Sequence, residues 1–142
     1  MADDSGLEVD ALKGAPGVLS ARYAGSRATD MDRVQLLLSR LSGLEGAART
    51  ASFRSVEAVA NEHGEILNVA EGSCEGVITT EPRGNNGFGY DPIFVPVGYD
   101  RTFAELATEV KDRISHRGKA LRLTRDFLIG YAGRLDRSSG AF

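Results

Sequence analysis

The stretch Ala2-Asp3-Asp4-Ser5-Gly6-Leu7 opens the chain and leads into an alternation of apolar residues at Leu7, Val9 and Ala11. A period of two is typical of a β-strand, so this segment predicts a strand that runs out of an acidic motif. Adjacent carboxylates at such a position can hold a hard divalent cation such as Mg²⁺ against a phosphate. They can equally be exposed acids at a turn, because acidic side chains are mostly found at the surface.

The composition is that of a globular protein with a core of its own. Of its 142 residues, 42% are hydrophobic and 26% are charged. A chain of this length buries roughly two-thirds of the surface that its unfolded form exposes. No apolar run approaches the about 20 residues needed to span a bilayer. We therefore expect one soluble domain over residues 1–142 that does not associate with membranes.

Charge and cysteine content bear on partners and location. The net charge is −3 and the 17 basic residues are spread along the chain, which does not favour binding to nucleic acid. The first residues lack the basic stretch and apolar core of a secretory signal, and the single Cys74 cannot form an internal disulfide. We expect a cytoplasmic protein whose partner is a small molecule.

Helix and strand patterns alternate along the rest of the chain. Apolar residues recur at helical spacing between Thr29, which can cap a helix, and Gly46. Residues 49–61 and 66–70 predict a β-hairpin. Further elements are expected as short strands over 77–79 and 93–95, a turn of helix over 102–106, and a longer helix capped by Ser115. This order predicts a single domain of the α/β class.

The segment 83–92 is rich in glycine and contains four residues suited to a planar base, namely Phe88, Gly89, Tyr90 and Asp91. An aromatic ring between flexible glycines can stack on a base, and the Asp91 carboxylate can accept hydrogen bonds from the edge of the base. The segment can also be an ordinary loop, because its glycines fit neither the dinucleotide fingerprint nor the Walker loop. Its role therefore depends on the residues that accompany it.

Lys111, His116 and Arg117 add donor groups at the entry to the last helix. Taken singly, Lys111 also fits a solvated lysine, and His116 a structural histidine beside a helix cap. Two enzyme classes are excluded. Cys74 has no cysteine or histidine partner at zinc-binding spacing, and no Gly-x-Ser-x-Gly motif of a serine hydrolase occurs.

Three signatures, in this order, resemble those of the inosine triphosphate pyrophosphatase family, in its bacterial dITP/XTP branch. They are Ala2–Leu12 with its continuation through residues 14–25, then Gly87–Phe94, and then Ile114–Leu121. Together they span nearly the whole chain. The resemblance implies an elongated α/β fold, with a mixed β-sheet flanked by helices, and a homodimer.

The resemblance also implies an enzyme that uses Mg²⁺ to hydrolyse non-standard purine nucleoside triphosphates (dITP, ITP and XTP) to the monophosphate and pyrophosphate. Asp4 would be the catalytic proton acceptor and a metal ligand, with Asp3 as a second acidic ligand. The residues that would bind the substrate are Ser5, Phe88, Gly89, Tyr90, Asp91, Lys111, His116 and Arg117. Their donors would select a 6-keto base, because an unpaired buried donor costs about 1–3 kcal/mol.

The chain departs from the family pattern at its beginning. Family members carry a first strand, a Ser/Thr-x-Asn-x-x-Lys phosphate loop and a metal-binding Glu before the acidic motif, and this sequence starts at Met1 without them. We therefore expect a member that lacks this segment and has an exposed sheet edge. A smaller departure is Asp112, which stands beside Lys111 where the family has Asn. Three hypotheses follow: an active pyrophosphatase, a catalytically impaired domain that binds nucleotide, and a structural or partner-binding remnant.

Overall fold

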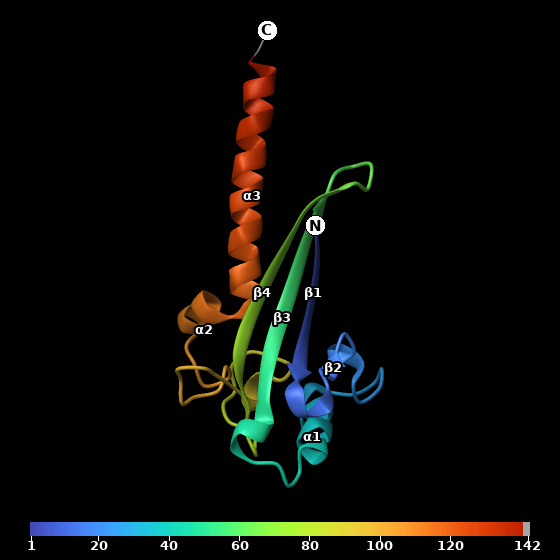
Figure 1. Ribbon diagram of the computed structural model, residues 1–142, viewed down its shortest axis with the longest axis vertical. Coiled ribbons are helices and arrows are strands. Elements are labelled where there is room, and N and C mark those ends of the chain that lie inside the picture. Colours follow the sequence, from blue (N-terminus) through green and yellow to red (C-terminus); the bar gives the residue numbers. More distant parts are fainter. Residues whose placement is uncertain (141–142) are drawn as a thin grey trace.

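The computed structural model describes residues 1–140, which form one β-sheet and three α-helices (Figure 1). The strands are β1 (Ala2–Val9), β2 (Pro16–Gly17), β3 (Thr50–Ala60), β4 (Ile66–Ile78) and β5 (Phe94–Pro96). The helices are α1 (Asp30–Arg40), α2 (Thr108–Ile114) and α3 (His116–Ser139). The predicted α/β fold is confirmed. None of the helices described is both long enough and apolar enough to cross a bilayer.

The strands lie in the order β2-β1-β3-β4-β5, and each neighbouring pair is antiparallel. The sheet was predicted to be mixed, but within residues 1–140 it is purely antiparallel. One reason is that a short turn joins β3 to β4, and a tight connection between neighbouring strands reverses the chain. β2 pairs only with Leu7 and Glu8 of β1. Among the described residues, the rest of this edge of β1 has no strand beside it.

β4 is one long strand where the sequence predicted two short ones. Gly72 and Gly76 lie inside it, and their lack of a side chain concealed the alternation. Gly72 is needed where α3 crosses the sheet, because a Cβ atom there would lie 2.1 Å from the carbonyl oxygen of His116. A side chain at this position would therefore hold α3 away from the sheet.

The helix signals in the sequence agree with the structure at their N-termini. The Thr29 side chain accepts a hydrogen bond from the Asp32 amide, and the Asp32 side chain accepts one from the Thr29 amide. Ser115 caps α3 through the amide of Gly118. Two extents differ from the prediction. α1 ends at Arg40 rather than continuing toward Gly46, and residues 102–106 form turns, with α2 following them.

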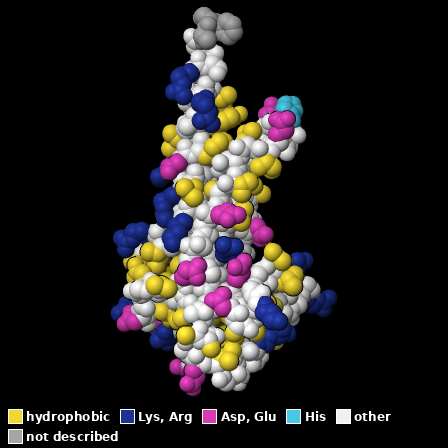
Figure 2. All heavy atoms as spheres, in the orientation of Figure 1, with side chains coloured by type: hydrophobic (Ala, Val, Ile, Leu, Met, Phe, Trp, Pro, Cys, Tyr) yellow, Lys and Arg dark blue, Asp and Glu magenta, His cyan; other side chains and the backbone are white. Residues whose placement is uncertain are grey.

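The core fills the lower half of the molecule in Figure 1, between the sheet and α1. Its largest buried side chains include Leu7, Phe94 and Phe103, together with Leu37 of α1. The upper half is thinner. There α3 extends alongside β3 and β4, and Figure 2 shows exposed hydrophobic side chains between this part of α3 and the neighbouring strands. The molecule is therefore elongated, as predicted.

Candidate active site

A cleft of about 690 Å³ opens between β1, the start of α1, the loop before β5 and the junction of α2 and α3. Every residue that the sequence assigned to the site lines this cleft. They are Asp3, Asp4, Ser5, Phe88, Gly89, Tyr90, Asp91, Lys111, His116 and Arg117. The fold therefore brings together the three segments that carry the sequence signatures.

The two acids of the opening motif lie on opposite faces of β1. Asp3 is paired with Glu57 and Asp4 with Val56 of β3, without a bulge, and successive side chains of a strand point to opposite faces. Asp3 is on the face that α3 covers, where its Oδ2 lies 3.5 Å from Nε of Arg117. The strand geometry does not bring Asp3 and Asp4 together as a pair of ligands for one ion. Residues 1–140 hold no group of three or more His, Cys, Asp or Glu side chains placed to bind a metal.

Glu57 is a residue of this region that the sequence analysis missed. It is fully buried opposite Asp3, and both of its carboxylate oxygens have no hydrogen-bond partner among the described residues. Burial raises the pKa of Glu57, the neighbouring Asp3 raises it further, and Arg117 partly opposes the shift. The available signal was the alternation of β3, which places Phe53, Ser55 and Glu57 on one face.

His116 is held as a neutral imidazole. Its ring stacks on Phe53, with ring centroids 4.6 Å apart and planes 10° apart. Burial lowers the pKa of His116 to about 4, and the positive charges of Arg117 and Lys111 contribute to the shift. Its Nδ1 atom is buried and has no partner among the described residues. At neutral pH the ring carries no charge, and it can still donate or accept a hydrogen bond with a bound molecule.

Phe88 presents an exposed aromatic ring between two cations. The residue is 60% exposed, and Nζ of Lys111 and Cζ of Arg117 lie 5.1 and 5.3 Å from the centroid of its ring. Such an arrangement suits a planar, electron-rich group that stacks on the ring and carries negative charge at one end.

Tyr90 and Asp91 support this loop rather than projecting from it. The buried Tyr90 donates its hydroxyl hydrogen to the carbonyl of Ser20 at 2.7 Å, and burial raises its pKa to about 12. Asp91 Oδ2 accepts from the Phe88 amide at 3.1 Å and from Nζ of Lys111 at 2.5 Å. Their side chains thus fix the backbone from which Phe88 extends.

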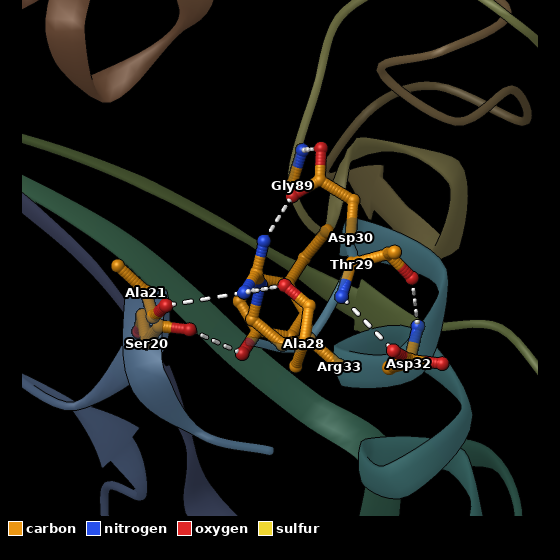
Figure 3. A network of polar contacts seen from close by, with 9 residues as sticks. Ser20, Ala21, Ala28, Thr29, Asp30, Asp32, Arg33 and Gly89 are labelled. Carbon is orange, nitrogen blue, oxygen red and sulfur yellow. Dashed lines mark hydrogen bonds and ion pairs between the residues drawn. The ribbon is translucent and has the colours of Figure 1, made fainter. Parts of the chain in front are cut away.

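Asp30 and Arg33 of α1 also line the cleft, and the sequence analysis did not assign them to the site. Figure 3 shows Asp30 between Arg33 and the loop: its carboxylate accepts from the Gly89 amide at 2.9 Å and from Arg33 at 2.6 Å. Arg33 also donates to the carbonyls of Ala28 and Ala21. The sequence signal for Asp30 is limited to its place directly after the capping residue Thr29, where an acid stabilises a helix N-terminus.

Comparison with known proteins identifies the group to which the chain belongs. Residues 1–127 match the sequence model described as the Ham1 family. This chain belongs to the Ham1 family. The match covers β1 through the first half of α3, so all the residues that line the cleft lie within it.

Relatives of this Ham1-family chain include named pyrophosphatases. It is 57% identical, over 90% of its length, to a dITP/XTP pyrophosphatase of Desulforamulus reducens, of which it covers 63%. It is 51% identical, over 86% of its length, to a dITP/XTP pyrophosphatase of Bacillus subtilis, of which it covers 61%. Among solved structures, a HAM1 protein from Coxiella burnetii superposes with a TM-score of 0.83 at 49% identity, covering 91% of this chain and 66% of that one. The chain thus spans less than two-thirds of the length of these two pyrophosphatases.

Proposed function

We propose that this chain hydrolyses dITP, ITP and XTP, non-standard purine nucleoside triphosphates, to the nucleoside monophosphate and pyrophosphate. The observation that carries the proposal is the single cleft in which an exposed aromatic ring, three donor side chains and the acids of β1 meet. The names of the relatives support the choice of substrate class. We propose in addition that the chain acts as a single domain, as a homodimer and in the cytoplasm.

The base would stack on Phe88, where Lys111 and Arg117 already face the ring. Arg117 and the neutral His116 could then donate to a 6-keto oxygen. A 6-amino group is itself a donor, so ATP would leave these donors unpaired at a cost of about 1–3 kcal/mol. This difference would make ITP preferred over ATP by roughly one to two orders of magnitude.

The phosphates would extend toward β1. Ser5, on the same face of β1 as Asp3, would donate its hydroxyl hydrogen to a phosphate oxygen. Asp4, on the other face but also lining the cleft, would orient the attacking water and accept its proton. Asp3 is less suited to this task, because its carboxylate lies close to Arg117 and to the Ser5 hydroxyl. Asp3 would instead hold Arg117 in place beside the substrate.

The proposed cofactor is Mg²⁺. Proteins commonly hold this ion through only one or two carboxylates, with phosphate oxygens and water as the other ligands, so Asp4 alone fits the ion without a partner side chain. When bound, the ion would supply positive charge that stabilises the leaving pyrophosphate. Asp3 would contribute only if the start of β1 departed from its regular alternation.

A second candidate is that the chain binds the nucleotide without turning it over. The scarcity of carboxylates that converge in the cleft favours this candidate. Incubating the protein with ITP or ATP and Mg²⁺, and separating the products by chromatography, distinguishes the two. IMP and pyrophosphate from ITP, with ATP almost untouched, supports the enzyme. If the folded protein binds IMP but forms no product, the second candidate is supported. If it binds neither ITP nor IMP, both candidates are contradicted.

A further inference from the structure

We propose that Asp30 is a positioning residue that sets the place of the Phe88 ring by holding the loop of residues 87–91 from the far side of the cleft. The inference rests on the proposed function in one respect, namely that this loop receives the base. The first turn of α1 lies outside the three sequence signatures, so this role is additional to those that the signatures imply.

The loop needs support from outside itself. Gly87 and Gly89 on either side of Phe88 have φ angles of 76° and 59°, in the left-handed region where glycine has no steric penalty. Phe88 itself is largely exposed, with the Lys111 and Arg117 side chains facing its ring. From within the loop, Asp91 fixes the amide of Phe88. Within residues 1–140, the amide of Gly89 is held from α1 alone, by Oδ2 of Asp30 at 2.9 Å, across 59 positions of sequence.

The carboxylate of Asp30 is itself held in place. Its Oδ1 accepts from Arg33 at 2.6 Å, and Arg33 reaches the carbonyl oxygens of Ala28 at 2.9 Å and Ala21 at 3.2 Å. The Arg33 side chain is only 16% exposed. The hydrogen bond from Arg33, and then that from Gly89, lower the pKa of Asp30 and keep it ionised as an acceptor. The first turn of α1, the segment 21–28 and the loop are thereby tied together (Figure 3).

This position differs from that of an ordinary acid at a helix N-terminus. Asp32 lies in the same turn and also stabilises α1, but its side chain accepts from the Thr29 amide. Within residues 1–140 no hydrogen bond or ion pair joins Asp32 to the loop. Loss of either acid should weaken the start of α1. Only loss of Asp30 should release Gly89. Asp32 therefore provides a matched control.

The test compares wild type with Asp30→Ala, Asp30→Asn and Asp32→Ala. Two quantities are measured: the Kd for IMP by calorimetry, and hydrogen exchange of the Gly89 amide in the protein without nucleotide. Asp30→Ala should weaken IMP binding by about tenfold, the equivalent of one hydrogen bond to a charged acceptor, and should speed exchange at Gly89. Asp30→Asn should lie between, because its amide oxygen still accepts from Gly89. Asp32→Ala should lower the melting temperature without changing either quantity.

Equal exchange and equal Kd in Asp30→Ala and Asp32→Ala would overturn the proposal. If wild type fails to bind IMP, the proposed function fails, while Gly89 exchange still decides whether Asp30 holds the loop. If the chain turns over ITP, Asp30→Ala should raise KM and leave kcat within about twofold, since the residue acts on binding rather than on the reacting phosphates.

Discussion

The imidazole of His116 lies flat against the ring of Phe53, with centroids 4.6 Å apart, and thereby joins the start of α3 to the centre of the sheet. This contact buries a titratable ring and lowers its pKa to about 4. The stability of the fold should therefore depend on the protonation of His116 below pH 6.5.

The sign of this dependence follows from proton uptake. An unfolded histidine has a pKa of about 6.5, so between pH 6.5 and 4 the unfolded state binds a proton that the folded state does not. The free energy of unfolding should fall as the pH drops through this window, by up to about 3 kcal/mol in total. Urea unfolding at several pH values measures it. His116→Phe keeps the stacking but cannot titrate, so its free energy of unfolding should change less with pH than that of wild type. The same pH dependence in both proteins would contradict the account.

Glu57→Gln should stabilise the protein. The buried carboxylate faces Asp3 and has no donor among the described residues, so its charge is unfavourable at neutral pH. Removing the charge should raise the free energy of unfolding by roughly 1–2 kcal/mol at pH 7.5. Glu71→Gln, at an exposed position of the neighbouring strand, is the control and should change little. A destabilised Glu57→Gln would mean that the carboxylate has a partner in solution.

Arg49 is a buried cation whose removal should be costly. Its guanidinium donates to the carbonyls of Leu41, Leu44, Ile78 and Thr79, and so joins the end of α1 to the end of β4. Arg49→Met should lower the free energy of unfolding by about 3 kcal/mol, because several buried acceptors lose their donor. Arg54→Met removes an exposed arginine that lies 3.8 Å from Glu8, and should cost less than about 1 kcal/mol. Equal effects would show that the Arg49 contacts are not stabilising.

Gly72→Ala should separate α3 from the sheet. The added methyl group would lie 2.1 Å from the His116 carbonyl oxygen and 2.8 Å from the Ala120 amide nitrogen, and both are backbone atoms. We expect a loss of about 3 kcal/mol or more, measured by thermal unfolding. Gly133→Ala, within α3 and with nothing within 4 Å of the added methyl group, should instead stabilise the protein by up to about 1 kcal/mol. If Gly72→Ala leaves the stability unchanged, α3 packs against the sheet more loosely than described.

The parts of the fold that could be predicted were those set by local chemistry. Thr29 and Ser115 mark helix starts through their own side chains, and the structure has both caps. Extents that depend on tertiary packing were not predicted. β4 was predicted as two strands because Gly72 and Gly76 interrupt its alternation of apolar and polar residues. Glycine is needed at these positions because α3 and β5 approach the strand closely there, and no local sequence pattern reveals that approach.

The candidate site shows the same division. The signature residues could be assigned to one site because three motifs occur together, and all of them line the cleft. Glu57 and Asp30 could not, since the first becomes significant only through its register with Asp3 and the second through a contact across 59 positions. The opposite orientation of Asp3 and Asp4 follows from the strand period and could have been inferred once the strand was known to include both.

The most direct test of the central claim, that the cleft receives a 6-keto purine nucleotide on Phe88, is a calorimetric titration of IMP and AMP into wild type and Phe88→Ala. The account predicts that wild type binds IMP at least about tenfold more tightly than AMP, and that Phe88→Ala weakens IMP by about 1–3 kcal/mol, the contribution of one stacked base. Equal affinity for IMP and AMP, or an IMP affinity unchanged by the loss of the Phe88 ring, would contradict it.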